Sequence, residues 1–336
     1  MQQVSSRAVK TAGFSLPYFF SRYGALLTIA VVVLIFSIIN DNFFSYRNLS
    51  DILRSVSITA FLALGVTVSL VVDGLDLSVG STTSLATIAA ASALVIHRQE
   101  LLVTLLVPLL LGILIGLLNA FLIIKIKLPD LLATLAVMYI VNGIQLTYTK
   151  GYSIYEGMPD VIGVGEVSGR FIPSFLFIGQ GDLWNIPMPV ILLAVITGLA
   201  YFFLEHTTMG RKMYMIGSNP EAARLYGIPI NAYRTLAYVI SALLATIGGI
   251  VLASRIGTGQ ISAGAPLLMD AVAAAFIGYA LFGGKRASVI GTLLGAILIG
   301  TLLNGLTMMN VPYYAQDIVK GVILVVALAF SFIRKR

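Results

Sequence analysis

Long apolar runs alternate with short polar stretches along most of the chain. A helix needs about 20 mainly apolar residues to cross the hydrocarbon core of a membrane, and ten stretches come near that length. Because backbone groups in lipid must be hydrogen-bonded internally, we predict helices; the alternating pattern of a membrane barrel is not found. The predicted spans are 24–39, 55–72, 79–96, 101–124, 128–148, 187–204, 235–254, 267–283, 288–308 and 313–333.

The composition narrows the class of protein further. Of 336 residues, 58% are hydrophobic and 10% are charged, whereas a soluble domain carries about 25% charged residues. The absence of cysteine excludes a disulfide scaffold, a thiolate metal site and a cysteine nucleophile. We therefore predict an all-α, multi-pass membrane protein with no metal site.

The Lys and Arg residues predict the orientation of the spans. With a cytoplasmic N-terminus, fourteen of them lie on the inner side and six on the outer side, which is the bias expected of cytoplasmic loops. Both termini are thus predicted to be cytoplasmic, with tails at 1–23 and 334–336 around one membrane domain at 24–333. Anchoring at an anionic leaflet explains the formal charge of +7 without a nucleic-acid partner.

Two connections between the predicted spans are long. The outer segment 149–186 is rich in Gly and Pro, which predicts turns; it is either a solvated loop or a lid or docking surface. The inner segment 205–234 contains a short predicted helix. Asn219 suits its N-cap and Pro220 its first position, while Gly227 and Pro229 end it.

A helix this short is not stable alone in water, so it must be held by other parts of the protein or by a partner. Either it packs on its own membrane domain, or it inserts as a knob into another protein. Glu221 lies in its first turn, where the helix dipole favours an anion.

Three sequence segments resemble the permeases of ribose-type ABC importers. They are MGRKMYMIGSNPEAARLYGIPI at 209–230, DGLDLSVG at 73–80, and SVIGTLLGAILIG at 288–300 followed by LNGL at 303–306. The segments occur in the order of the family, and the resemblance covers roughly residues 45–330. Three ordered matches are more specific than any one of them.

The resemblance implies a function, a fold and a set of partners. The chain would be the permease subunit of an importer in the bacterial cytoplasmic (inner) membrane, with an architecture like the vitamin-B12 importer. A separate cytoplasmic ABC ATPase would bind ATP and Mg, a periplasmic or lipid-anchored binding protein would deliver a monosaccharide, and a second permease copy or a paralogue would complete a dimer. The residues on the family's ATPase-coupling helix are Asn219, Glu221, Ala222, Ala223, Arg224 and Gly227.

The chain departs from the family pattern at a few turns. Asp73 stands where the family usually has a small neutral residue, and Tyr279, Lys285 and Ala287 replace glycines of the family pattern. These changes leave the local backbone and the solute open.

The segment 73–80 carries two carboxylates in an apolar region. Ionised groups in a membrane are costly and usually have a role, so an exposed hairpin competes with a break between two half-helices that line a cavity. We favour the break and expect Asp76 to be structural, with Asp76 and Ser78 capping the helix that starts near Val79. The residues assigned to this break are Asp73, Gly74, Asp76, Ser78 and Gly80.

Several polar residues fall inside predicted spans. A polyol solute needs hydrogen-bond donors and acceptors, often beside an aromatic face, although the same residues can simply bond helix to helix. Asp317 and Lys320 are three apart and can pair on one helix face. The candidate translocation path consists of Asn119, Asn142, Gln145, Asp270, Tyr279 and Asn304.

The sequence lacks the usual motifs of an enzyme. The nearest approach to a P-loop, around Gly284-Lys285, fails because Arg286 follows the lysine. We therefore expect a transport subunit without catalytic residues or a bound cofactor. The alternatives are a permease for nucleosides or a furanose-like signalling molecule, and an ion-coupled secondary transporter with Asp270 and Asp317 as ion sites.

Overall fold

The computed structural model describes residues 29–160, 163, 167–281, 286–312, 314–322 and 325. Helices dominate this part of the chain, and seven of them are long and apolar enough to cross a membrane. They are α2 (Tyr46–Val71), α3 (Val79–Ala91, continued to Ile96), α4 (Leu101–Ala120, continued to Lys125), α5 (Asp130–Thr149), α7 (Met188–Tyr201, continued to His206), α10 (Ile230–Ile256) and α12 (Val289–Met308). The three continuations are π-helical turns.

Shorter apolar helices accompany these spans. They occupy Ile29–Ile39 and α11 (Ala265–Leu281), and another helix covers 314–322. The prediction of a helical membrane protein is confirmed. The count of ten spans and the cytoplasmic termini stay predictions, because the tails 1–23 and 334–336 and the ends of the first and last predicted spans lie outside the described residues.

Helix α2 begins nine residues before its predicted start at 55. Ser45 is its N-cap and accepts a hydrogen bond from the backbone N–H of Asn48 at 3.3 Å. The polar residues of the first three turns hid this start from a hydropathy pattern. Among them, Arg54 bonds the carbonyl oxygens of Gly179 and Gln180 at 3.2 and 2.9 Å, so its charge sits at the end of the helix bundle and not within the apolar part.

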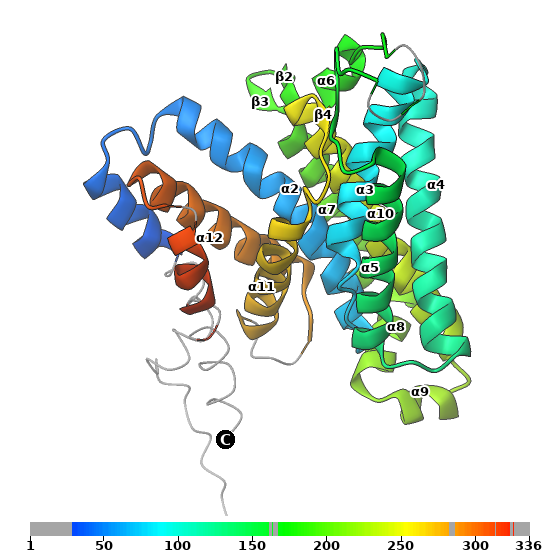
Figure 1. Ribbon diagram of the computed structural model, residues 1–336. Coiled ribbons are helices and arrows are strands. Elements are labelled where there is room, and N and C mark those ends of the chain that lie inside the picture. The colour runs from blue at the N-terminus through cyan, green and yellow to red at the C-terminus, as the bar shows by residue number, and fades with distance from the viewer. Residues whose placement is uncertain are drawn as a thin grey trace, which may run out of the picture.

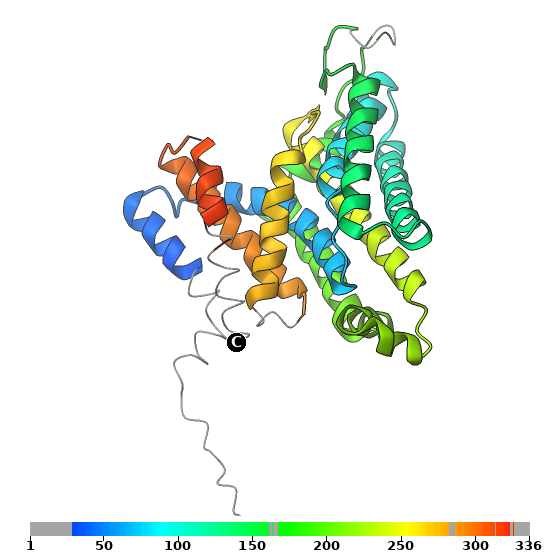
Figure 2. The same cartoon turned by 60° about the horizontal axis from the view of Figure 1, so that its bottom comes forward.

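Helix α10 is the central helix of one group of spans. It packs along α2, α3 and α4, with α5 beside α3, whereas α11 packs on α12 and α2 (Figures 1 and 2). Helix α2 therefore belongs to both groups, and Figure 2 shows α11 standing between α12 on one side and the α3–α5 group on the other.

Glycines allow the closest helix contacts. A Cβ atom on Gly116 of α4 would lie 2.8 Å from the carbonyl oxygen of Tyr238 in α10. On α12, a Cβ on Gly295 would lie 2.3 Å from the carbonyl oxygen of Ala274 in α11. Both glycines belong to Gly-x-x-x-Gly motifs, at 112–116 and 291–295, which permit such approach between membrane helices.

The outer segment 149–186 is partly folded into the protein. Strand β1 (Ile154–Tyr155) pairs antiparallel with β4 (Thr258–Gly259) after α10, and β2 (Asp182–Leu183) forms a hairpin with β3 (Ile186–Pro187). Phe175 in α6 (Pro173–Gln180) is completely buried, as is Ile154. A purely solvated loop is therefore wrong for the described residues of this segment, since its apolar side chains cover the ends of α3 and α10.

Candidate functional site

The inner segment folds into two short helices, α8 (Thr208–Ser218) and α9 (Pro220–Leu225), at the end of the molecule opposite α6 (Figure 1). Asn219 Oδ1 accepts a hydrogen bond from the backbone N–H of Ala222 at 3.0 Å, so the predicted N-cap is confirmed. Gly227 follows the C-cap with φ +71°, a conformation that suits glycine. The local sequence alone thus accounts for where α9 starts and ends.

Helix α9 has one buried face and one exposed face. Ala223 is completely buried, whereas the side chains of Arg224 and Glu221 are 73% and 83% exposed and lie 4.0 Å apart. Leu225 and Tyr226, at the end of the helix, are 89% and 76% exposed. The helix is therefore held by its own domain through a small side chain, and it presents charged and large apolar groups outward.

Helix α8 connects α9 to the membrane domain. Gly217 lies against the end of α2, because a Cβ there would be 2.2 Å from the carbonyl oxygen of Val71. Tyr214 places its hydroxyl 3.0 Å from the carbonyl oxygen of Ala287, just before α12, and 3.2 Å from Glu205. Burial and the negative charge of Glu205 both raise the pKa of Tyr214, so it stays a neutral donor. A displacement of α8 would thus act on α2 and α12 together.

The break between α2 and α3 is built around Asp76, whose side chain is fully buried. Asp76 Oδ1 accepts from the backbone N–H and the hydroxyl of Ser78 at 2.9 and 2.6 Å. Its other oxygen, Oδ2, accepts from the hydroxyl of Ser241 in α10 at 2.8 Å. Asn119 of α4 donates to Ser78 Oγ at 2.8 Å. The carboxylate therefore joins the break to two other helices and has little acceptor capacity left.

These contacts decide between the two accounts of segment 73–80. An exposed hairpin is wrong, because Gly74, Asp76, Ser78 and Gly80 are buried and Asp73 alone of the five assigned residues is exposed. Ser78 holds the N-cap position of α3, as predicted, but its side chain makes no capping hydrogen bond and donates to Asp76 instead. Asp73 takes a φ of +59°, which Asp tolerates better than most residues.

A second polar cluster near this break was not predicted. Asp130, at the start of α5, accepts from Arg234 of α10 at 2.7 Å and from the hydroxyl of Tyr238 on the same oxygen. Gly74 packs directly on this cluster, since a Cβ would lie 2.4 Å from the Tyr238 hydroxyl. The available signal was the opposite charge of Asp130 and Arg234, both at the inner ends of predicted spans.

The six residues of the candidate path do not form one site. Asn119 belongs to the Asp76 cluster, and Gln145 donates to Asn142 within α5 at 2.8 Å. Asn304 of α12 donates to Asn48 of α2 at 2.9 Å. The remaining two lie on α11, where Tyr279 is half-buried and Asp270 is buried. These bonds use the amide N–H groups, while the side-chain oxygens of Asn119, Gln145 and Asn304 are buried without a hydrogen-bond partner among the described residues. The assignment of these residues to a solute path stays a prediction.

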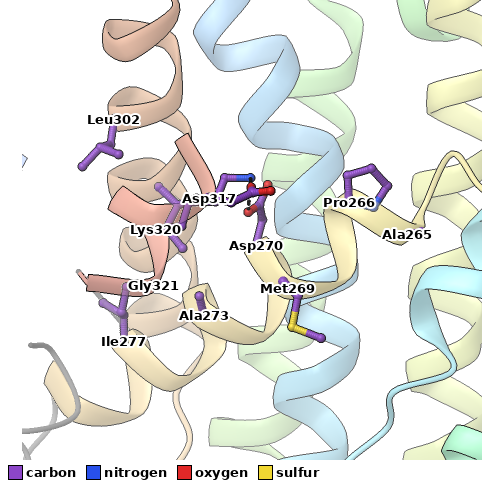
Figure 3. A pocket seen from close by; sticks show the side chains of 11 residues that line it. Ala265, Pro266, Met269, Asp270, Ala273, Ile277, Leu302, Asp317, Lys320 and Gly321 are labelled. Carbon is purple, nitrogen blue, oxygen red and sulfur yellow. Dashed lines mark ion pairs between the residues drawn. The ribbon is translucent and has the colours of Figure 1, made fainter. Parts of the chain in front are cut away.

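Asp270 lines a cavity of about 480 Å³ between α11, α12 and the helix at 314–322. Lys320 Nζ lies 3.0 Å from Asp270 Oδ1 and 3.2 Å from Asp317 Oδ1 (Figure 3). The rest of the lining is mainly apolar, with Met269, Ala273 and Leu302 among it. No group of three acidic or histidine side chains that could hold a metal ion occurs in the part of the chain that the structure describes.

Comparison with known proteins places this architecture in a family. Residues 48–328 match the family model described as branched-chain amino acid transport system / permease component. The ribose import permease of Haemophilus influenzae is 33% identical over 318 residues, which cover 95% of each chain. That of Bacillus subtilis is 34% identical over 306 residues, or 91% of each chain.

A xylose transport system permease is similar as well. The protein from Haemophilus influenzae is 32% identical over 353 aligned positions, which cover 91% of this chain and 94% of the relative. The family match at 48–328 includes the inner segment with α9, the break at Asp76 and the cavity at Asp270. The chain is therefore a multi-pass membrane permease, and it belongs to the family of branched-chain amino acid transport system permease components.

Proposed function

We propose that the chain is the membrane subunit of an ATP-driven importer that carries a monosaccharide, a ribose-like pentose or a hexose, into the cytoplasm. The relatives named for ribose and xylose import support the solute class. ATP and Mg would be bound by a separate ABC ATPase, and a binding protein would deliver the solute at the opposite face. The subunit would work as a dimer with a second copy or a paralogue in the bacterial cytoplasmic membrane.

The exposed face of α9 is the observation that carries this proposal. A helix of six residues that presents Leu225 and Tyr226 to its surroundings has the form of a knob for a cleft in a partner. Behind it, α8 contacts the end of α2 through Gly217 and reaches Ala287 through Tyr214. Closure of the ATPase around α9 would then be transmitted to both groups of spans, which alternating access requires.

The test is ATP-dependent uptake by the full complex in proteoliposomes, with a panel of labelled monosaccharides and nucleosides. We expect uptake of a monosaccharide that requires the partner ATPase and persists when a protonophore collapses the proton gradient. Uptake without the ATPase would refute the proposal, and loss of uptake with the gradient would support an ion-coupled transporter. Uptake of nucleosides alone would favour the nucleoside alternative.

Variants of α9 test its role directly. Leu225→Ala with Tyr226→Ala should lower both ATPase co-purification and uptake about tenfold, as removal of interface anchors does, while the permease itself stays folded. Trp184→Ala is the matched control for ATPase co-purification, because Trp184 is also highly exposed, at 87%, but lies in the β2–β3 hairpin at the other end of the molecule (Figure 1). Charge reversal of Glu221 or Arg224 should act in the same direction, and unchanged assembly in all these variants would contradict the role of α9.

A further inference from the structure

The cavity beside α11 has the size and lining of a small-molecule site. Its volume of about 480 Å³ lies within the range of roughly 300–1,000 Å³ found for ligand pockets, which are mostly apolar with a few polar groups. Pro266 and Met269 stand exposed at its edge, and Ala273 and Ile299 lie deeper in the lining. The polar groups, Asp270, Asp317 and Lys320, gather in one place (Figure 3).

The charges in this cavity are unequal in number and in exposure. One ammonium group, on Lys320, lies between two carboxylates, so the cluster carries an excess negative charge. The Asp270 side chain is 6% exposed and that of Lys320 is 23% exposed, whereas that of Asp317 is 74% exposed. Asp317 therefore belongs to the rim, and the inner pair Asp270–Lys320 faces the cavity. Ionisable groups at membrane depth are costly, and they commonly mark the path of a solute.

The inner pair is not saturated by its protein contacts. Lys320 Nζ lies 3.0 Å from Asp270 Oδ1 and 3.2 Å from Asp317 Oδ1, so the ammonium group contacts one oxygen of each carboxylate. An ammonium group has three N–H donors, and its two carboxylate neighbours account for two of them at most. The ion-pair contacts thus leave Oδ2 of Asp270 and one N–H of Lys320 for a molecule in the cavity.

We propose that this cavity binds the polyhydroxylated solute on its way through the membrane, with Asp270 accepting hydrogen bonds from its hydroxyl groups and Lys320 donating to them. This inference rests on the proposed function, and it assigns the solute contacts within the permease. Apolar side chains such as Met269 and Ile299 would contact the C–H faces of the ring. The excess negative charge favours an uncharged polyol over a sugar acid or a sugar phosphate.

The absence of native cysteine allows a direct occupancy test. We suggest Ala273→Cys, one turn from Asp270 in the cavity lining, and Ala274→Cys as its neighbour control. Ala274 is completely buried and does not line the cavity. In the full complex in vesicles, a water-soluble maleimide should label position 273, and high millimolar D-ribose or D-xylose should slow this labelling about tenfold, the effect of a site that is mostly occupied. D-Gluconate should not slow it, and position 274 should show no sugar effect.

The result distinguishes the inference from the proposed function. If the Ala273→Cys complex imports a sugar that leaves the labelling rate unchanged, the cavity assignment is wrong and the proposed function stands. If no monosaccharide is imported or protects, both fail. Protection by D-gluconate equal to that by D-ribose would overturn the assignment of a neutral polyol.

A charge exchange separates solute binding from a merely structural ion pair. Asp270→Lys combined with Lys320→Asp keeps a pair of opposite charges between α11 and the helix at 314–322 but moves the acceptor and the donor. We expect normal assembly, with uptake reduced about tenfold or more and sugar protection of a cysteine at 273 lost. Uptake and sugar protection in the exchanged protein equal to those of the unmodified protein would overturn the proposal. If the exchanged protein does not assemble, Asp270→Asn is examined in the same labelling test. Loss of sugar protection then supports the proposal, and unchanged protection overturns it.

Discussion

Asp76 and Asp270 are both buried acidic residues in apolar surroundings, but the protein treats them differently. Within the described residues Asp76 pairs with no lysine or arginine; it accepts hydrogen bonds from Ser78 and Ser241, and its side chain is fully buried. Asp270 pairs with Lys320 beside a cavity of about 480 Å³. A carboxylate that is enclosed and bonded through both oxygens fixes the path of the chain, whereas one that is paired through a single oxygen beside a cavity is available to a ligand. The surroundings of a buried charge, and not its burial, indicate its role.

The largest loss of stability is expected at Asp76. Asp76→Leu would leave the donors of Ser78 and Ser241 buried without an acceptor, at about 1–3 kcal/mol for each group, so the folded protein should lose roughly 3 kcal/mol or more. Thermal unfolding of the purified permease in detergent measures this. The control is Asp73→Asn in the same segment, where the side chain is exposed. An unfolding temperature for Asp76→Leu equal to that of the control would show that Asp76 has no structural role.

The next largest loss is expected when the inner pair of the cavity is broken. Lys320→Met leaves the carboxylate of Asp270 buried and unpaired, which should cost about 2–3 kcal/mol, less than for a fully enclosed pair because the cavity admits water. Asp270→Leu together with Lys320→Met should recover most of this stability while uptake stays low. The same unfolding assay, with uptake beside it, checks both. Recovered uptake in the double variant would show that Asp270 is structural, as Asp76 is, and is not needed for the solute.

A single donor of the Asp76 cluster should have an intermediate effect. Ser241→Ala removes the hydroxyl that donates to Asp76 Oδ2 at 2.8 Å, and we expect a loss of about 1–2 kcal/mol because one buried acceptor is left unsatisfied. Thr235→Ala, at a partly exposed position of the same helix α10, should change stability by less than about 0.5 kcal/mol. Equal effects of the two variants would show that the cluster does not hold the break.

The smallest effect is expected at the rim of the cavity. Asp317 is 74% exposed, and its contact with Lys320 at 3.2 Å is a solvated pair. Asp317→Asn should therefore change stability by less than about 0.5 kcal/mol and leave sugar protection in the labelling assay in place. A loss as large as that of Lys320→Met would show that Asp317, and not Asp270, is the main partner of the lysine.

Local patterns in the sequence predicted part of this picture well. The span 79–96 agrees with α3 and its continuation, and the signals at Asn219 and Gly227 located both ends of α9. Caps and hydropathy depend on neighbours in the chain, so these features can be read locally. The start of α2 was missed because Arg54 disrupts the apolar pattern. In the folded chain Arg54 forms an ion pair with Asp182 at 2.6 Å.

Partners that are distant along the chain could not be predicted. Asp317 was the visible neighbour of Lys320, three residues away, but Asp270, fifty residues away, is its buried partner. In the same way, the hydrogen bond from Asn119 to Ser78 in the break could not be predicted, because the two residues lie 41 positions apart in the chain. The chemistry of such residues permits both roles, and the neighbour that the fold supplies selects one.

The sequence by itself determined that this protein is a helical membrane permease. The length of the apolar stretches, the distribution of Lys and Arg, and the three segments that resemble the family can all be recognised without a structure. It also determined the short helix α9, whose ends depend on residues within one turn. Only the tertiary structure decided that Asp76 is enclosed while Asp270 borders a cavity. The reason is that burial and hydrogen-bond saturation depend on which helices meet, and that is settled by packing between segments far apart in the chain.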